Sequence, residues 1–160
     1  KRSDIVKAHF EKTEYSPATT AAPSNPGLKA TWHDFKGKTC SEIAAAPVKK
    51  TYRVEDVTIP KGVKSFIIGL TYKGYINIPE DGIYSFYLSS DDGSMLYIDG
   101  KQVIDNDGLH APGEVTGQAA LKQGYHPIEV QYFDHGGGSI NLKVCDNNGK
   151  EMPFTYLYAH

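Results

Sequence analysis

The chain has 160 residues, enough for one domain with a buried core, and its formal net charge is −2. Because lysine and arginine form no long run, the charge pattern excludes the basic surface expected of a nucleic-acid-binding protein. No apolar stretch approaches the roughly 20 residues of a membrane-spanning helix. The 16 glycines, 9 prolines and 11 tyrosines, interspersed with short apolar runs, indicate an all-β protein.

The first part of the chain differs in composition from the rest. Residues 1–15 show a weak alternation of apolar and charged residues, and we expect a tail or the last strand of a preceding domain. Residues 16–27 contain three prolines and no charged residue, a composition typical of an interdomain linker. We therefore expect the main domain at residues 28–160. Since the chain begins without a methionine, we also expect it to be part of a longer protein.

Short segments between turn signals are predicted as strands throughout the main domain. They are residues 28–35, 51–59, 66–70, 75–78, 83–89, 95–99, 102–104, 115–121, 125–133 and 139–144. Asp99-Gly100 joins two of them in a predicted hairpin, because both turn positions favour positive φ. Residues 41–46 are expected to form one helical turn that ends at Pro47. The pattern predicts an all-β, antiparallel two-sheet β-sandwich of about ten strands.

The two cysteines leave one question open. Cys40 and Cys145 allow a single intrachain disulfide, and two buried free thiols are the alternative.

Two adjacent carboxylates form the most informative local feature. Asp91 and Asp92 follow the alternating strand of residues 83–89 and precede Gly93. Like charges side by side repel, and a bound cation makes such a pair favourable. The alternative is turn chemistry, because aspartates accept backbone N–H bonds in loops. Catalysis is disfavoured, since neighbours on a strand point apart whereas glycosidase carboxylates face one another across roughly 5–9.5 Å.

A series of motifs in a fixed order runs through most of the chain. They are residues 28–32 (LKATW), 74–86 (GYINIPEDGIYSF), 90–94 (SDDGS), 96–100 (LYIDG), 121–125 (LKQGY) and 130–138 (VQYFDHGGG). In this order they resemble the domain first named from anthrax protective antigen, the PA-fourteen family. The resemblance implies a β-sandwich of the kind found in bacterial toxins, glycosidases, adhesins and yeast cell-wall lectins.

The resemblance also implies a calcium site. In the lectin members an Asp-Asp pair, joined by a cis peptide, chelates calcium, which in turn holds sugar hydroxyls. This role carries over to Asp91 and Asp92. A second loop of those lectins supplies an asparagine, and here Asp134 is the oxygen ligand that would take its place. We therefore expect calcium as the cofactor and Asp91, Asp92 and Asp134 as both metal and carbohydrate ligands.

Three further residues are candidates for sugar contact. Because loops of family members cluster at one end, we expect His110 on the same rim as Asp91, with a solvated loop as the alternative. His135, among loop glycines, is either a sugar ligand or a solvent-facing side chain. Phe133, opposite in phase to Tyr132 and next to the glycine loop, is the best candidate for an exposed ring on which a sugar stacks, although core packing is the favoured interpretation.

Residues 2–10 resemble the tail of the sandwich that is appended to bacterial β-hexosaminidases. The resemblance implies that the chain is the carboxy-terminal module of a secreted bacterial glycoside hydrolase. We predict a non-catalytic carbohydrate-binding module whose partners are a glycan and the catalytic domain of the same polypeptide. The expected location is secreted, periplasmic or on the cell surface. The alternative is a structural module that packs against and shapes the catalytic domain without a ligand of its own.

Overall fold

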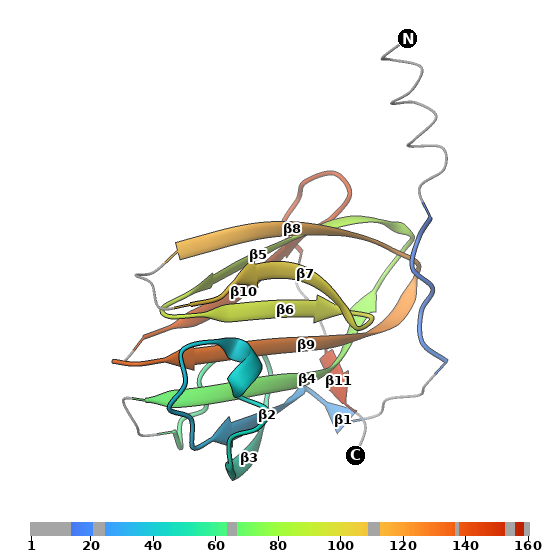
Figure 1. The fold of residues 1–160 in the computed structure, drawn as a ribbon. Helices are drawn as coiled ribbons and strands as arrows, with labels where there is room; N and C mark the ends of the chain where they lie inside the picture. The colour runs from blue at the N-terminus through green and yellow to red at the C-terminus, as the bar shows by residue number, and fades with distance from the viewer. Residues whose placement is uncertain are drawn as a thin grey trace.

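The computed structural model describes residues 14–20, 25–63, 67–108, 113–136, 138–152 and 156–158. Two antiparallel sheets pack against each other as a β-sandwich (Figure 1). This arrangement confirms the predicted fold class. The weak alternation near the start of the chain lies outside the described residues.

The larger sheet has eight strands in the described part of the chain. They are β1 (Asn25–Pro26), β2 (Leu28–His33), β3 (Val48–Val54), β4 (Ile68–Ile78), β6 (Ser94–Ile98), β7 (Lys101–Asn106), β9 (Gly124–Asp134) and β11 (Tyr156–Tyr158). Its main order is β1-β11-β4-β9-β6-β7, and β2 lies between β3 and β4. The first half of β4 therefore pairs with β2 and its second half with β11.

The smaller sheet has the order β10-β5-β8. Its strands are β10 (Ile140–Cys145), β5 (Gly82–Ser90) and β8 (Gly113–Leu121). Every second residue of β5 is buried, as its alternating sequence predicts. Tyr84, Phe86 and Leu88 point from this strand into the core, where they join Tyr72 and Tyr132 of the larger sheet. Burial of each such side chain stabilises the fold by about 1.5–3 kcal/mol.

The central strand β4 differs from its prediction. Residues 66–70 and 75–78 were expected to be separate strands, and this prediction is wrong because one strand of eleven residues runs from Ile68 to Ile78. Tyr72 keeps the inward alternation across the expected break and is fully buried. The partner strand β9 matches β4 in length and pairs with it throughout, so no turn interrupts either strand.

A short helix covers part of the outer face of the larger sheet. The 3₁₀ helix η1 (Cys40–Glu42) lies where a helical turn was expected over residues 41–46, and it is shorter than expected. Together with β6 and β9 it encloses a second set of buried apolar residues, here called the outer cluster. The outer cluster consists of Phe35, Cys40, Ile43, Met95 and Phe133. Among the described residues, no helix is both long and apolar enough to cross a membrane.

Both cysteines are buried and free. Cys40 belongs to the outer cluster, whereas Cys145 ends strand β10 of the smaller sheet. Of the two alternatives left open by the sequence, the structure therefore has two buried thiols.

Both ends of the described chain lie at one end of the sandwich, here called the chain-end pole. Residues 14–20 run past the start of β9, where the Ser16 backbone N–H donates to the Ala120 carbonyl (2.8 Å). The Ser16 hydroxyl donates to the carboxylate of Asp99 (2.5 Å), which the Nδ1 atom of buried His126 also contacts at 2.9 Å. Strand β11 pairs with the last part of β4 at the same pole (Figure 1, right-hand side).

Candidate metal centre

Three carboxylates meet at the end of the sandwich opposite the chain-end pole. Asp91 and Asp92 directly follow β5 of the smaller sheet, and Asp134 is the last residue of β9 in the larger sheet. One oxygen from each carboxylate lies within 4.8 Å of the others. Asp134 is 2% exposed, whereas Asp91 and Asp92 are half-buried. We call these three residues the acidic cluster.

Backbone hydrogen bonds hold the two loops of the acidic cluster together. The Asp92 N–H donates to the Phe133 carbonyl (3.2 Å), and the Phe133 N–H donates to the Gly93 carbonyl (3.0 Å). The Asp91 N–H donates to the Ser139 carbonyl (3.1 Å). The Asp91–Asp92 peptide bond is cis, as the resemblance implies. Loops that belong to different sheets are thus fixed at one edge.

A buried tyrosine of the main core contacts the backbone of the acidic cluster. The Tyr132 hydroxyl donates to the Asp91 carbonyl (2.9 Å). Burial raises the pKa of this phenol, and the negative charges of Asp134, Asp91 and Asp92 raise it further. The phenol therefore stays protonated and keeps its role as a donor at neutral pH.

Two backbone N–H groups donate to the carboxylates themselves. The His135 N–H donates to Asp92 Oδ2 (2.9 Å), and the Gly136 N–H lies 3.3 Å from Asp134 Oδ1. These contacts orient the carboxylates in the manner of turn aspartates. Because each carboxylate has about four acceptor positions, the same oxygens can also bind an ion.

Three polar residues beneath the cluster were not identified from the sequence. The Ser90 hydroxyl donates to the Asp92 carbonyl (2.7 Å) and lies 2.5 Å from the Ser94 hydroxyl. The Asn106 amide donates to Ser90 Oγ (3.3 Å). Ser90 and Ser94 are at most 2% exposed. A serine at an inward position of an alternating strand is the signal that could have revealed Ser90.

Two glycines allow the close approach of these loops. A Cβ atom added at Gly138 would lie 2.2 Å from the Asp91 carbonyl oxygen and 3.1 Å from Asp134 Oδ1. A Cβ atom at Gly93 would lie 2.4 Å from the Phe133 ring. Any side chain at either position would push the loops apart.

The geometry of the acidic cluster suits a hard cation. Calcium binds oxygen ligands at 2.3–2.6 Å, so two oxygens on one ion are at most about 5 Å apart. The three carboxylates meet this limit without a change in the backbone. Their mutual repulsion is offset when a cation lies between them. The structure therefore brings together the three ligands expected from the sequence in an arrangement that calcium can occupy.

The other predicted contacts are placed differently. Phe133 is no exposed sugar platform, because its ring is fully buried in the outer cluster, 5.3 Å from the Phe35 ring, as the core-packing interpretation predicts. The His135 ring is half-buried, and its Nε2 atom lies 2.6 Å from the Gly37 carbonyl oxygen. This ring is therefore bound to the loop before η1, while its backbone N–H contacts the cluster. His110 lies outside the described residues.

The chain is similar to known proteins over most of its length. A family model described as the PA14 domain matches residues 24–156. A β-hexosaminidase of Porphyromonas gingivalis is 36% identical over 141 residues, which cover 81% of this chain and 18% of that protein. The chain thus spans less than a fifth of this relative's length.

Solved structures share the fold. The PA14 sugar-binding domain from an RTX adhesin has a TM-score of 0.71 and 17% identity, covering 86% of this chain and 100% of that one. The Epithelial Adhesin 6 A domain from Candida glabrata, solved in complex with Galβ1-3GlcNAc, has a TM-score of 0.59 and 9% identity. That comparison covers 88% of this chain and 90% of the adhesin domain.

Proposed function

This chain belongs to the PA14 domain family, and from that membership we propose that it is a non-catalytic carbohydrate-binding module assisted by calcium. We further propose that Asp91, Asp92 and Asp134 hold the ion, which then binds sugar hydroxyls directly. The observation that carries the proposal is the convergence of these carboxylates, from loops of two sheets, within 4.8 Å of one another.

Two comparisons support a sugar as the ligand. The adhesin domain that shares this fold is described as sugar-binding, and the Candida domain was solved with a disaccharide. The spacing of the acidic cluster also favours a shared ion over hydrolysis, because the two catalytic carboxyl groups of a glycosidase stand about 5–9.5 Å apart across the scissile bond. A calcium ion with open positions can exchange water for vicinal hydroxyls of a sugar.

Attachment to a glycoside hydrolase is part of the proposal. Its support is the similarity to a much longer β-hexosaminidase, of which this chain would correspond to an accessory segment. A location outside the cytoplasm, secreted, periplasmic or on the cell surface, follows from the same proposal. Extracellular modules bind calcium with a Kd of about 0.1–1 mM, and we expect an affinity in this range.

Calcium titration of the isolated chain tests the metal site. We expect calcium to raise the free energy of unfolding by about 2.7 kcal/mol at a concentration one hundred times the Kd. The variants Asp92→Asn and Asp134→Asn should lose this stabilisation, measured by calorimetric unfolding in calcium and in chelator. Asp34→Asn removes the same charge from an exposed residue outside the cluster and should retain it.

A glycan array then tests the sugar site. Capture by the wild type should depend on calcium and disappear in Asp92→Asn, with the fold checked by circular dichroism. Glycan capture by Asp92→Asn in chelator would contradict the proposed role of the cluster. An array that stays blank under all conditions would favour a structural module that acts on a neighbouring domain.

A further inference from the structure

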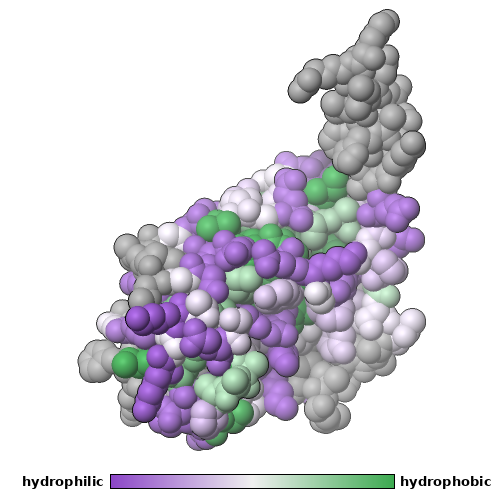
Figure 2. Space-filling view, viewed as in Figure 1, coloured by the Kyte–Doolittle hydropathy of each residue, from purple (hydrophilic) through white to green (hydrophobic). Residues whose placement is uncertain are grey.

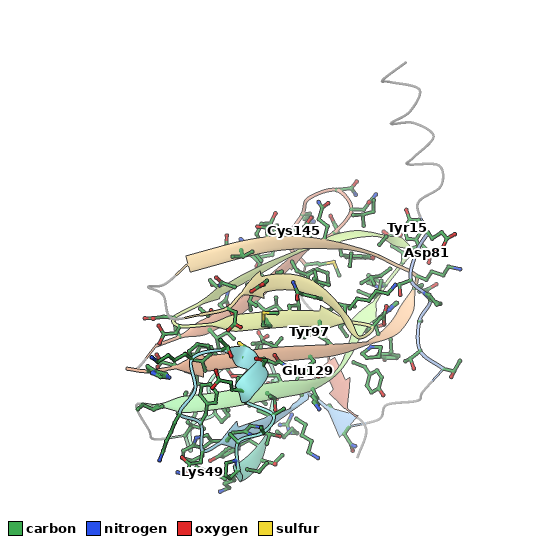
Figure 3. The ribbon with its side chains drawn as sticks, in the orientation of Figure 1. Tyr15, Lys49, Asp81, Tyr97, Glu129 and Cys145 are labelled. Atoms are coloured by element: carbon green, nitrogen blue, oxygen red, sulfur yellow. The ribbon has the colours of Figure 1, made fainter. Side chains whose placement is uncertain are left out.

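Four residues form a continuous row across the outer face of the larger sheet. Lys29 of β2 lies opposite Lys73 of β4, which lies opposite Glu129 of β9, which lies opposite Tyr97 of β6. The residue before each of them along its strand is buried in the core, so the row itself points outward. Figure 3 shows Tyr97 and Glu129 next to each other on the face turned toward the viewer.

A groove lies above this row. One hollow of about 580 Å³ is lined by all four residues and extends to Tyr75. A second hollow of about 290 Å³ shares Lys29, Lys73 and Glu129 with the first and reaches Ala44 beside η1. The two hollows therefore form one groove, and Figure 2 shows many hydrophilic residues on this face. The volume is within the range of about 300–1,000 Å³ typical of ligand sites.

The groove has unbalanced positive charge at one end. Like charges directly opposite each other on paired strands are destabilising, and Lys29 and Lys73 are such a pair. Within the described residues neither lysine forms an ion pair. Glu129, the one carboxylate in the row and the residue opposite Lys73, instead accepts a hydrogen bond from the Gln131 side chain (2.8 Å). An anion between the two lysines would offset their repulsion.

We propose that this groove is a second saccharide site, specific for an oligosaccharide that contains hexuronic acid. The carboxylate of one sugar binds between Lys29 and Lys73. Hydroxyl groups of the next sugar bind Glu129 and Gln131, which offer an acceptor and an amide. The apolar face of a sugar ring lies on Tyr97, which is half-buried at the edge of the groove. A neutral glycan would leave the lysine pair without its counter-charge.

The dimensions of the row fit a short oligosaccharide. Three strand spacings separate Lys29 from Tyr97, a distance of about 14 Å, which matches two to three sugar rings. The site is also separate from the acidic cluster. Glu129 precedes Asp134 by five residues of β9, or about 17 Å, and the two side chains alternate to opposite faces. Binding in the groove therefore requires no calcium.

Calorimetric titration with trigalacturonate, carried out in chelator, tests the second site. We expect wild-type binding with a Kd on the order of 1 mM, and binding of the neutral galactose trimer at least about tenfold weaker. The double variant Lys29→Gln/Lys73→Gln should weaken trigalacturonate binding at least about tenfold, because the charge pair is lost. Lys61→Gln/Lys150→Gln removes the same charge from exposed residues outside the groove and should change the Kd less than about twofold.

Several outcomes would overturn the inference. Two of them concern other sugars: the neutral galactose trimer binds as tightly as trigalacturonate, or a sulfated galactose trimer binds more tightly. A third is that Lys29→Gln/Lys73→Gln binds trigalacturonate as the wild type does. The fourth is that a hexaglutamate peptide binds as tightly as trigalacturonate. The last result would assign the groove to an acidic protein surface. Asp92→Asn should bind trigalacturonate as the wild type does, since it alters only the acidic cluster. Binding that needs calcium and is lost in Asp92→Asn would refute the second site and leave the calcium site supported.

Discussion

Gly138 determines how closely the two loops of the acidic cluster approach. Its Cα lies so near the Asp91 carbonyl that no side chain fits between them. The glycine thus serves a packing requirement at a loop that also carries the candidate ligands. Such a position is sensitive to the smallest substitution, although it contributes no ligand atom of its own.

We predict that Gly138→Ala weakens calcium binding at least about tenfold, equivalent to about 1.4 kcal/mol. The added Cβ, 2.2 Å from the Asp91 oxygen, must move Asp91 away from Asp134. Calcium affinity measured by isothermal titration checks this result. Gly136→Ala is the matched control, because a Cβ at Gly136 meets no atom within 4 Å and should leave the affinity unchanged. Equal affinities for the two variants would refute this account of the loop.

Phe133 shows what alternation along a strand can and cannot predict. Its phase, opposite to that of the inward Tyr132, correctly places the ring on the outer face of β9. The ring is nevertheless buried and not available as a sugar platform, because Phe35 and Ile43, distant in the chain, fold over that face as part of the outer cluster. No local pattern near Phe133 carries information about this cover. Whether an outward-facing residue is buried can therefore be read only from the tertiary structure.

The outer cluster connects η1 to the acidic cluster. It packs on Phe133, whose carbonyl accepts the Asp92 N–H and whose own N–H donates to Gly93. The cluster lies on the opposite face of β9 from the main core. Stability of the loop that carries Asp92 thus depends on a segment that offers no ligand.

We predict that Ile43→Ala lowers the free energy of unfolding by about 2–5 kcal/mol, because Ile43 is fully buried and the truncation leaves a cavity. It should also weaken calcium binding several-fold, since the support behind Phe133 is loosened. Urea unfolding and calcium titration measure the two effects. Val48→Ala, on the same side of the sandwich but 60% exposed, should change stability by less than about 0.5 kcal/mol. Comparable losses in both variants would contradict a special role for the outer cluster.

Sequence patterns located most strands, and the failures have identifiable causes. The strand at residues 83–89 corresponds to β5, and the Asp99-Gly100 hairpin joins β6 to β7 as expected. The break expected within β4 is absent, since Gly74 stays paired with Ile128 of β9 although it lies between the segments that pair with β2 and β11. Strand β11 was missed because it is only three residues long. The meeting of the Asp91 and Asp134 loops was inferred from the family resemblance, because local patterns do not reveal which loops of two sheets adjoin.

Three buried ionisable groups make the whole fold sensitive to alkaline pH. Burial, followed by the negative charge of Asp107, raises the pKa of the Cys40 thiol. Burial likewise raises the pKa of Tyr72 and of Tyr132. In the unfolded chain these groups ionise near their ordinary values of about 8.5 and 10. Deprotonation therefore favours the unfolded state, and the stability present below these values is lost as pH rises above them.

We predict that the free energy of unfolding falls above about pH 9, at up to about 4 kcal/mol per pH unit once all three groups ionise in the unfolded chain. Urea unfolding at a series of pH values measures this slope, and Tyr132→Phe should reduce it by about one third above pH 10. Tyrosinate absorbance should show part of the tyrosines ionising only as the fold is lost. Complete ionisation in a chain that remains folded would refute the prediction.

The opposed positions of the chain-end pole and the acidic cluster affect how strongly the molecule would be retained on a surface. Strand β9, eleven residues long, separates them by about 35 Å. A polypeptide joined at the chain-end pole would therefore present the cluster at the far tip, free of steric hindrance from the junction. If the cluster binds a glycan as proposed, a site held in this way meets its ligand at an effective concentration in the millimolar range. Retention would then depend on how densely the surface displays the glycan, and an enzyme joined at that pole could move between sites without leaving the surface.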